Sequence, residues 1–378
     1  MSTAAAAYRR LDSKPTLSEK TDSLKIRFGI LSPYDASERA RQMAAMPVST
    51  FCGECLTWAG QPDPENDPSR IREAFSGGSV GPAFDQAIGT CVLAGFGEAP
   101  DTTRKWVIRQ DVPNYLITDI LRVEDRSVLK PLPRGATAEA ADLNVYGNNW
   151  RLVRFASRVV VDEQSYTNDS WNAIADAAKQ QGRAVRRLIQ DAVYSLMLSN
   201  PNLFDGVAMF DAAGHGNLAS GGSSALAAAS LATACGVIRN RTIQPGTGDI
   251  IHLGLSPAVL LLPPDLERVG LETLRLRMLD GVENIEPVVE SRIGTAGVLD
   301  PFDRKTTRKG SATNWYLVCD GTVAPSIILG FLDGQRVPSV RQFVLPPGLG
   351  QWGIGWDIQY ACAVQALDYR EIYGSLGA

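Results

Sequence analysis

Histidine is nearly absent from this sequence: only His215 and His252 occur among 378 residues. Histidine is the commonest metal ligand and the side chain that changes charge near neutral pH, so this scarcity disfavours His-rich metal sites and His-based catalysis. The chain also has no HExxH or P-loop motif, and no GxGxxG preceded by an expected strand. We therefore expect no enzyme activity, no cofactor, and no catalytic, cofactor-binding or metal-binding residues.

The sequence also has no segment that predicts a membrane anchor. Its longest stretch without charge, 212–238, is mostly Ala, Ser and Gly, which enter hydrocarbon far less favourably than Leu or Ile. No signal peptide precedes the six cysteines, so we expect a reducing compartment and free thiols without a disulfide framework. We expect no membrane partner.

Charge of one sign does not dominate, since 37 basic residues stand against 41 acidic ones. A net charge of -4 argues against a surface that grips nucleic acid everywhere, so any DNA contact is expected to be local. Hydrophobic residues make up 44% of the chain and charged residues 21%, an ordinary globular composition. The length favours two domains.

The first 75 residues contain five prolines between positions 33 and 68 and only short apolar patches, such as 48–56. This pattern predicts an arm that needs a partner surface to become ordered. From Gly78 to Gly97 apolar residues recur at helical spacing, which predicts a docked helix.

Extended structure is expected from Lys105 to Val161, where two apolar runs flank the turn-rich segment Leu129–Asn149. The simplest interpretation is a long two-stranded ribbon. Because an isolated ribbon is marginally stable in water, we expect it to lie on another surface, such as another copy of the chain.

A long helix is the clearest expected element. Thr167, Asn168 and Asp169 offer N-capping oxygens, and apolar residues repeat at helical steps until Asn200-Pro201. A shorter helix is expected from Ser223 or Ser224 to Ile238.

The second half is expected to mix strands and helices. One strand is predicted by strict alternation, with large apolar residues on one face. These residues are Trp352, Ile354, Trp356, Ile358 and Tyr360. The other expected elements are strands at 250–253, 259–262, 288–292, 314–319 and 326–332 and a helix at 264–278.

Several residues could carry chemistry, and each has a simpler explanation. Cys52 and Cys55 form a CxxC, but a zinc site needs about four ligands and no second CxxC or nearby His is present. His215 lies between glycines, which favours a loop position over a catalytic base. Gly350, Gly353 and Gly355 approach a phosphate-loop spacing, but the last two alternate with Trp and Ile as in a packed strand.

Three arginines, Arg151, Arg154 and Arg158, fall in the return limb of the expected ribbon. They could face phosphate or acidic groups of a neighbouring subunit, or lie on a solvated ribbon face. The spacing favours neither alternative.

From Gly78 to the C-terminus the chain resembles the major head subunit family of Mu-like prophages, often fused to or encoded beside a prohead protease. The resemblance is carried by the order of nine short segments. They are LAGFGEAP (93–100), VPNY (112–115), NPNLFDGVAMF (200–210), HGNLA (215–219), LLLPP (260–264), NWYL (314–317), AP (324–325), FLDGQ (331–335) and LDYREIY (367–373).

The resemblance implies an α+β, Hong Kong 97-type major capsid fold with four parts. They are an N-terminal arm at 1–104, an extended loop at 105–161, a peripheral domain with a long spine helix at 162–262 and 336–378, and an axial domain at 263–335. It further implies a tailed-bacteriophage head protein that assembles as hexamers and pentamers into an icosahedral shell around double-stranded DNA.

The implied partners are copies of the chain itself, a portal, a scaffold or prohead protease, decoration proteins, and DNA bound non-specifically. The implied location is the virion capsid, assembled in the host bacterial cytoplasm. Some relatives crosslink through a lysine of the extended loop, but no partner or acidic catalyst for Lys130 can be identified here, so no crosslink is predicted. The alternative is a cellular nanocompartment shell of the same fold, similar to encapsulins.

Overall fold

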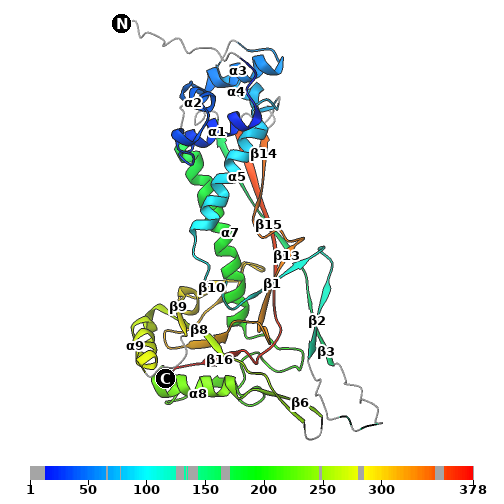
Figure 1. Ribbon diagram of the computed structural model, residues 1–378, viewed down its shortest axis with the longest axis vertical. Helices are drawn as coiled ribbons and strands as arrows, with labels where there is room; N and C mark the ends of the chain where they lie inside the picture. The colour runs from blue at the N-terminus through cyan, green and yellow to red at the C-terminus, as the bar shows by residue number, and fades with distance from the viewer. Residues whose placement is uncertain are drawn as a thin grey trace. The chain divides into compact units, whose positions relative to one another are not determined.

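The computed structural model describes residues 13–64, 67–76, 78–124, 132, 134, 144–162, 171–246, 249–279, 285–344 and 353–377. They form two units (Figure 1). The first contains 1–100, 154–187 and 337–360, and the second contains 101–153, 188–336 and 361–378. The described residues contain both helices and sheets, so the predicted α+β class is confirmed.

The first unit begins with a series of short helices: α1 (Leu17–Arg27), η1 (Pro33–Asp35), α2 (Glu38–Ala45), α3 (Val48–Ala59) and α4 (Asp67–Ser76). Their ends follow local rules. Thr16 and Glu19 form a capping box on α1, the Ser37 hydroxyl caps α2, and α3 ends at Gly60, which adopts the left-handed conformation that glycine tolerates.

This region corrects the expectation of an arm without order of its own. Each of the four α-helices contributes a few buried apolar side chains, including Leu24, Met43, Phe51, Leu56 and Ile71. The apolar patches are short because each belongs to a helix of eight to twelve residues. Together these patches form a core, although none is long enough to show helical periodicity on its own.

Helix α5 (Gly81–Glu98) confirms the helix expected from Gly78 to Gly97. It packs against the first part of α7 (Trp171–Ser199), the long helix, whose later residues belong to the second unit. A Cβ on Gly95 would lie 2.1 Å from the carbonyl oxygen of Lys179, and one on Gly182 would lie 2.0 Å from that of Val92. The two glycines therefore allow the helix backbones to touch.

The sheet part of the first unit joins three strands, β4 (Val153–Asp162), β14 (Ser339–Val344) and the first half of β15 (Gly353–Ala366). β14 and β15 are antiparallel, from Ser339 opposite Gln359 to Val344 opposite Ile354. The alternation predicted for β15 is confirmed from Ile354 to Tyr360, whose even-numbered side chains are buried. Trp352 lies outside the described residues.

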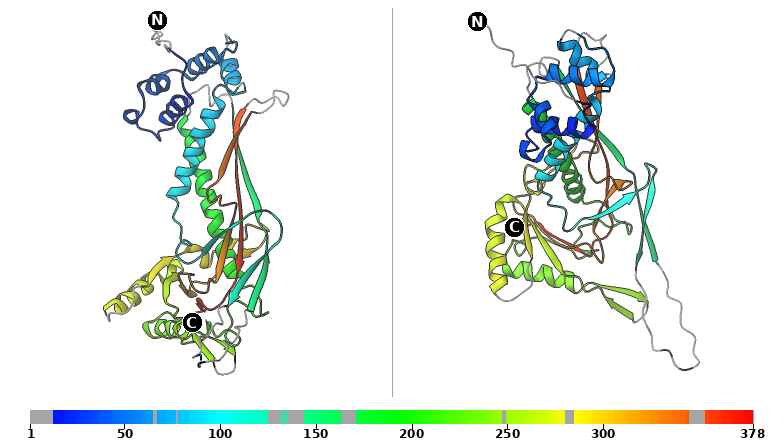
Figure 2. Two further views of the ribbon diagram at one scale, coloured as in Figure 1. Left: turned by 45° about the vertical axis from the view of Figure 1, so that its right-hand side comes forward. Right: turned by 45° about the horizontal axis from the view of Figure 1, so that its top comes forward.

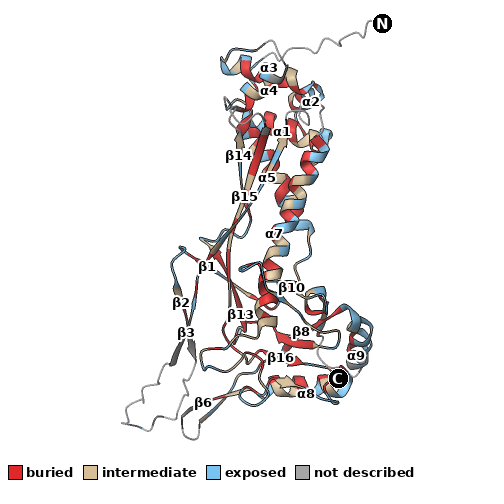
Figure 3. Cartoon of the chain, turned by 180° about the vertical axis from the view of Figure 1, so that it is seen from behind, coloured by how far each residue is buried: buried red, intermediate tan, exposed pale blue. Residues whose placement is uncertain are grey.

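The second unit contains a mixed five-stranded sheet in the order β5-β16-β12-β8-β9. Its strands are β5 (Leu218–Ala219), β8 (Pro257–Leu262), β9 (Glu286–Val289), β12 (Trp315–Cys319) and β16 (Ile372–Ser375). Two helices, α8 (Ala228–Arg239) and α9 (Glu267–Leu279), pack with this sheet, and η2 (Pro264–Leu266) precedes α9. Figure 3 shows α9 as mainly exposed and β8 and β16 as mainly buried.

Two boundaries in the second unit differ from expectation. α8 begins at Ala228 instead of Ser223 or Ser224, because the Ser224 hydroxyl donates to Gly221 and its carbonyl accepts hydrogen bonds from Trp315 and Ser375. The strand expected at 288–292 is β9, which ends at Val289 and is followed by a turn of 3-10 helix, η3 (Ser291–Ile293).

The expected long ribbon is only partly confirmed. β2 (Thr118–Glu124) pairs with β3 (Asn144–Trp150), from Thr118 opposite Trp150 to Glu124 opposite Asn144, and the two lie side by side in Figures 1 and 2. β1 (Ile108–Val112), however, pairs in parallel with β13 (Ile327–Leu332), and β13 pairs with the second half of β15. The outer limbs therefore belong to larger sheets, and β3 lies where a turn-rich segment was expected.

Two hairpins complete the described fold: β6 (Thr242–Gly246) with β7 (Asp249–His252), and β10 (Val298–Leu299) with β11 (Thr307–Arg308). Helix α7 ends at Ser199, followed by Asn200 with positive φ and then Pro201, as predicted. Its expected N-capping residues lie outside the described residues. Among the described residues, no helix is both long and apolar enough to cross a membrane.

Candidate functional site

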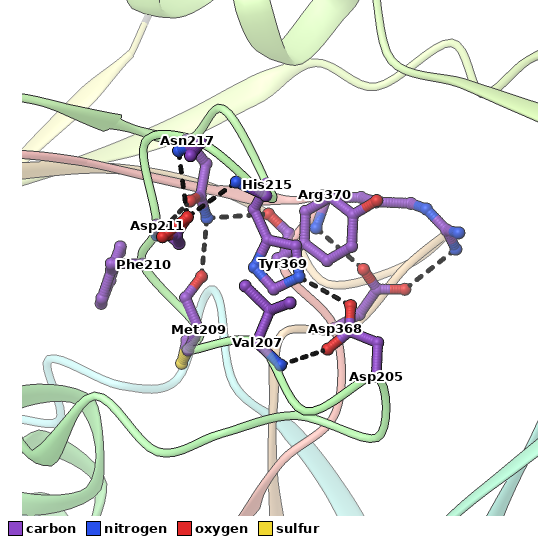
Figure 4. Close-up of polar contacts among 12 residues, drawn as sticks. Asp205, Val207, Met209, Phe210, Asp211, His215, Asn217, Asp368, Tyr369 and Arg370 are labelled. Atoms are coloured by element: carbon purple, nitrogen blue, oxygen red, sulfur yellow. Dashed lines mark hydrogen bonds and ion pairs between the residues drawn. The ribbon is translucent and has the colours of Figure 1, made fainter.

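His215 lies in a turn of the second unit, as predicted, but its side chain is only 2% exposed. Its ring stacks on that of Tyr369, with centroids 3.8 Å apart and an interplanar angle of 8°, and its Nε2 lies 2.8 Å from Oδ2 of Asp205 (Figure 4). The guanidinium groups of Arg241 and Arg370 lie over the Tyr369 ring, 5.3 and 5.5 Å from its centroid. We call these five residues the His215 cluster.

The turn that carries His215 is tied to the C-terminal strand by Asn217, which is fully buried. Its Nδ2 donates to the carbonyl of Met209 at 2.8 Å and to that of Ile372 at 3.3 Å, while its Oδ1 accepts from the amide of Asp211 (Figure 4). Asn217 thereby satisfies backbone groups of two segments far apart in sequence, which holds them in a fixed arrangement.

His215 and Asp205 form a hydrogen-bonded pair in the His215 cluster. Burial is the largest single influence and raises the pKa of the Asp205 carboxyl, but the hydrogen bonds from His215 and from the amide of Val207 together with smaller effects outweigh it, and the pKa lies below its usual value. The guanidinium of Arg241 donates to the His215 carbonyl at 2.7 Å. The ring is therefore held by stacking on Tyr369 and by one hydrogen bond to Asp205, and among the described residues no hydroxyl or thiol is hydrogen-bonded to it.

The cysteines are all free and buried. Cys52 and Cys55 lie on α3, and burial raises the pKa of Cys55 to about 11 and that of Cys91 to about 12. Thiols with such pKa values are protonated at neutral pH, which makes them poor nucleophiles and ligands. Across the described ranges, no three His, Cys, Asp or Glu side chains form a metal-binding group.

Two of the three ribbon arginines find partners on their own chain, which neither sequence alternative included. Arg158 forms a bidentate ion pair with Asp357 of β15, at 2.7 and 2.9 Å, and lies over the ring of Phe343. Arg154 donates to the side-chain oxygen of Gln359. Both side chains therefore bind the neighbouring strand of their own chain, while Arg151 is exposed between β3 and β4.

The remaining candidate residues from the sequence, His252 and the three glycines, do not belong to the His215 cluster. His252 is exposed on β7. Gly353 and Gly355 lie in β15, which confirms a packed strand: a Cβ on Gly355 would lie 2.4 Å from the carbonyl oxygen of Val159. Gly350 and Lys130 lie outside the described residues.

The short ribbon is anchored at its base. Trp150 is buried, and a Cβ on Gly330 would lie 2.4 Å from its indole, while Asn148 donates to the carbonyl of Ala366 at 2.9 Å. Beside this base, the loop between β1 and β2 exposes Leu116 by 70% and Ile117 by 68%. Adjacent exposed apolar side chains of this size are typical of interaction surfaces.

Sequence reasoning noted His215 but missed its partners. Asp205, His215 and Tyr369 fall in three segments singled out for their order along the chain: 200–210, 215–219 and 367–373. Their meeting in space depends on the pairing of β16 with β5 and β12, which no local pattern indicates.

Comparison with known protein families gives one match, to a family described as phage capsid protein, over residues 148–375. This match covers more than half of the chain. A search among curated protein sequences found no match.

Solved structures give weaker likenesses. The chain is similar to the virus-like particle of Pyrococcus furiosus (TM-score 0.45, 10% identity, covering 77% of this chain and 99% of that chain). It is also similar to the capsid of cyanophage P-SCSP1u (TM-score 0.45, 9% identity, 72% and 86%). The SrpI encapsulin of Synechococcus elongatus gives TM-score 0.43, 11% identity, and coverage of 73% and 87%.

Proposed function

Because this chain belongs to the phage capsid protein family, we propose that it is the major head subunit of a tailed bacteriophage. In this proposal, copies of the chain form hexamers and pentamers, which close an icosahedral shell around double-stranded DNA. The observation that carries the proposal is the family match over residues 148–375. Membership of a capsid family places the chain in the virion shell and makes other copies of itself its main partner.

Two features of the described structure support contact between copies. In the described residues β2 and β3 form a sheet of two strands, and two-stranded ribbons are marginally stable alone. Leu116 and Ile117 stand exposed beside it. We propose that a neighbouring subunit covers this loop, as the expected extended loop at 105–161 would require.

The finer assignments are also proposals. They comprise the Mu-like affiliation, assembly in the host cytoplasm, and the division into arm (1–104), extended loop, peripheral domain and axial domain. The further proposed partners are a portal, a scaffold or prohead protease, decoration proteins and DNA. We also propose that the protein acts without catalysis, since the His215 cluster is explained by its structural contacts.

Electron microscopy of the expressed full chain tests the proposal. The expected result is large symmetric particles, or at least pentamers and hexamers, and DNA-filled particles when the portal, scaffold and protease are supplied. A stable monomer under all these conditions would contradict the shell role. Closed particles that enclose a protein cargo, take up no DNA and carry no portal would instead indicate a nanocompartment.

A further inference from the structure

The β10–β11 hairpin concentrates positive charge in a chain whose net charge is -4. Four of the six residues from Arg304 to Lys309 are basic, and Asp300 and Asp303 are the hairpin's only acidic residues. Arg304, Lys305 and Lys309 are exposed. The hairpin therefore presents an excess of cations to solvent.

Both carboxylates accept hydrogen bonds from residues of the hairpin's own turn. Asp300 accepts a hydrogen bond from the amide of Phe302 at 2.9 Å. Asp303 accepts from the amides of Lys305 and Thr306 at 2.9 and 3.1 Å and from the Thr306 hydroxyl at 2.6 Å. These bonds, led by that from Lys305, lower the pKa of Asp303 to about 2. The acids therefore shape the turn.

The exposed cations are available to an outside partner. Among the described residues, no ion pair or hydrogen bond occupies the side chains of Arg304, Lys305 or Lys309. By contrast, Arg109, Arg158, Arg292 and Arg370 of the same chain are paired with carboxylates.

Arg304 also occupies a backbone conformation that disfavours it. Its φ of 52° lies in the left-handed region, where glycine would be unstrained, and its amide closes the turn by donating to the Asp300 carbonyl at 2.8 Å. A strained, exposed arginine at a turn tip is a local cost to folding. Such an outlier suggests that the side chain serves a function.

The base of the hairpin is firmly held, so the cations are presented on an ordered turn. Val298 pairs with Arg308, Leu299 pairs with Thr307, and Val298 is buried. A Cβ on Gly310 would lie 1.8 Å from the carbonyl oxygen of Ile293, which shows how closely the two backbones approach. Ordering before binding reduces the entropy lost on binding.

We propose that the β10–β11 hairpin binds the phosphate backbone of duplex DNA through Arg304, Lys305 and Lys309. The proposal rests on the proposed function, which supplies the DNA. Flexible cations on a short turn suit sequence-independent phosphate contacts, which release counterions and weaken steeply with salt. The local patch also agrees with a chain whose overall charge excludes a generally basic surface.

The test compares binding of a short labelled DNA duplex to the unassembled full chain and to a variant carrying Arg304→Gly, Lys305→Ser and Lys309→Gln. Glycine relieves the backbone strain at 304, so the variant is expected to fold. The matched control carries Arg104→Gln, Arg268→Gln and Arg275→Gln, which removes three exposed charges elsewhere in the same unit.

The hairpin variant should bind more weakly, equally for all DNA sequences, and its log affinity should fall less steeply with log salt. The slope should change by about 0.9 for each phosphate that the variant no longer neutralises. The control should bind as the unaltered chain does. Equal binding by hairpin variant and control would overturn the proposal, as would no DNA binding by the unaltered chain at low salt.

Two further results separate the possible explanations. If the hairpin variant binds DNA normally but no longer assembles, the hairpin contacts a neighbouring subunit and the DNA proposal is wrong. Polyglutamate that competes as well as DNA of equal charge would also overturn it. If the unaltered chain never forms DNA-containing particles, the proposed function fails, while hairpin-dependent binding to the unassembled chain would remain measurable.

Discussion

At the scale of single residues, a close backbone approach in the first unit depends on Gly95 of α5 and Gly182 of α7. A methyl group at either position would lie about 2 Å from a carbonyl oxygen of the facing helix, and a backbone atom cannot rotate away. We predict that Gly95→Ala destabilises the protein by about 3 kcal/mol, the upper range for overpacking. Thermal and denaturant unfolding of the soluble chain would measure the loss.

Gly89 provides the matched control for this prediction, because it lies in the same helix and a Cβ there would meet nothing within 4 Å. Gly89→Ala should stabilise the protein by about 0.5–1 kcal/mol, since alanine favours helix over glycine. If both substitutions had the same effect, the close crossing of α5 and α7 would not be what requires glycine at 95.

The buried thiols give a second residue-scale prediction. Burial raises the pKa of Cys55 to about 11 and those of Cys91 and Cys362 to about 12, so native thiols should react slowly with a disulfide reagent at mildly alkaline pH. All six should react once the chain is unfolded. Rapid labelling of any of these three thiols in the native protein would contradict the buried positions.

The same pKa shifts determine the sign of a pH effect. The native pKa values lie above the unfolded value of about 8.5, so the stabilisation is complete below that pH. As the pH rises above about 8.5, the unfolded state loses protons that the native state keeps, and stability falls until the native thiols titrate. Unfolding midpoints measured across this range should therefore decrease.

At the scale of elements, the loop between β1 and β2 is the clearest candidate for an interface between copies. We predict that a double Leu116→Ser, Ile117→Ser variant assembles poorly. Both apolar side chains are largely exposed in the single chain, and in the proposed shell a neighbouring subunit buries them. Its unassembled form should unfold within about 0.5 kcal/mol of the unaltered chain, as expected for surface positions. Normal shells from this variant, judged by sedimentation and microscopy, would exclude the loop as an interface.

The elements differ in how far sequence could predict them. Helix α7 was predictable because its apolar repeat is long and Asn200-Pro201 marks its end. The parallel pairing of β1 with β13 was not, since it joins residues more than two hundred positions apart. The helices in the first 75 residues were missed because each is short and buries only a few of its own apolar side chains. Such a helix shows no long apolar repeat in the sequence.

At the scale of the whole molecule, the order of short segments along the chain predicted the family before any contact could be predicted. The structure gives a physical reason, since segments at 200–210, 215–219 and 367–373 meet at Asn217 and the His215 cluster. Each segment alone is too short to show a helical or strand repeat that would indicate its position. The candidate residue His215 could be found from sequence, but its stacking on Tyr369 could not.

Removing the C-terminal segment tests whether this convergence holds the second unit together. β16 lies between β5 and β12 in the sheet, Ile372 is fully buried, and the Ser375 hydroxyl donates to Ser224 at 2.6 Å. Ending the chain after Ala366 would remove this strand, expose the edge of β12 and leave Asn217 without its Ile372 partner. We predict an insoluble or protease-sensitive second unit that forms no particles.

Deleting Ala378 alone is the control, because it leaves every residue of β16 in place. Limited proteolysis would separate the outcomes: the truncated chain should be cleaved throughout 188–336, whereas the control should resist cleavage there as the full chain does. The truncated sheet loses an interior strand, which leaves the edge of β12 unpaired and buried polar groups without hydrogen-bond partners. Both effects destabilise the second unit. A truncated chain that stayed protease-resistant and assembled would show that β5 and β12 are held by other contacts.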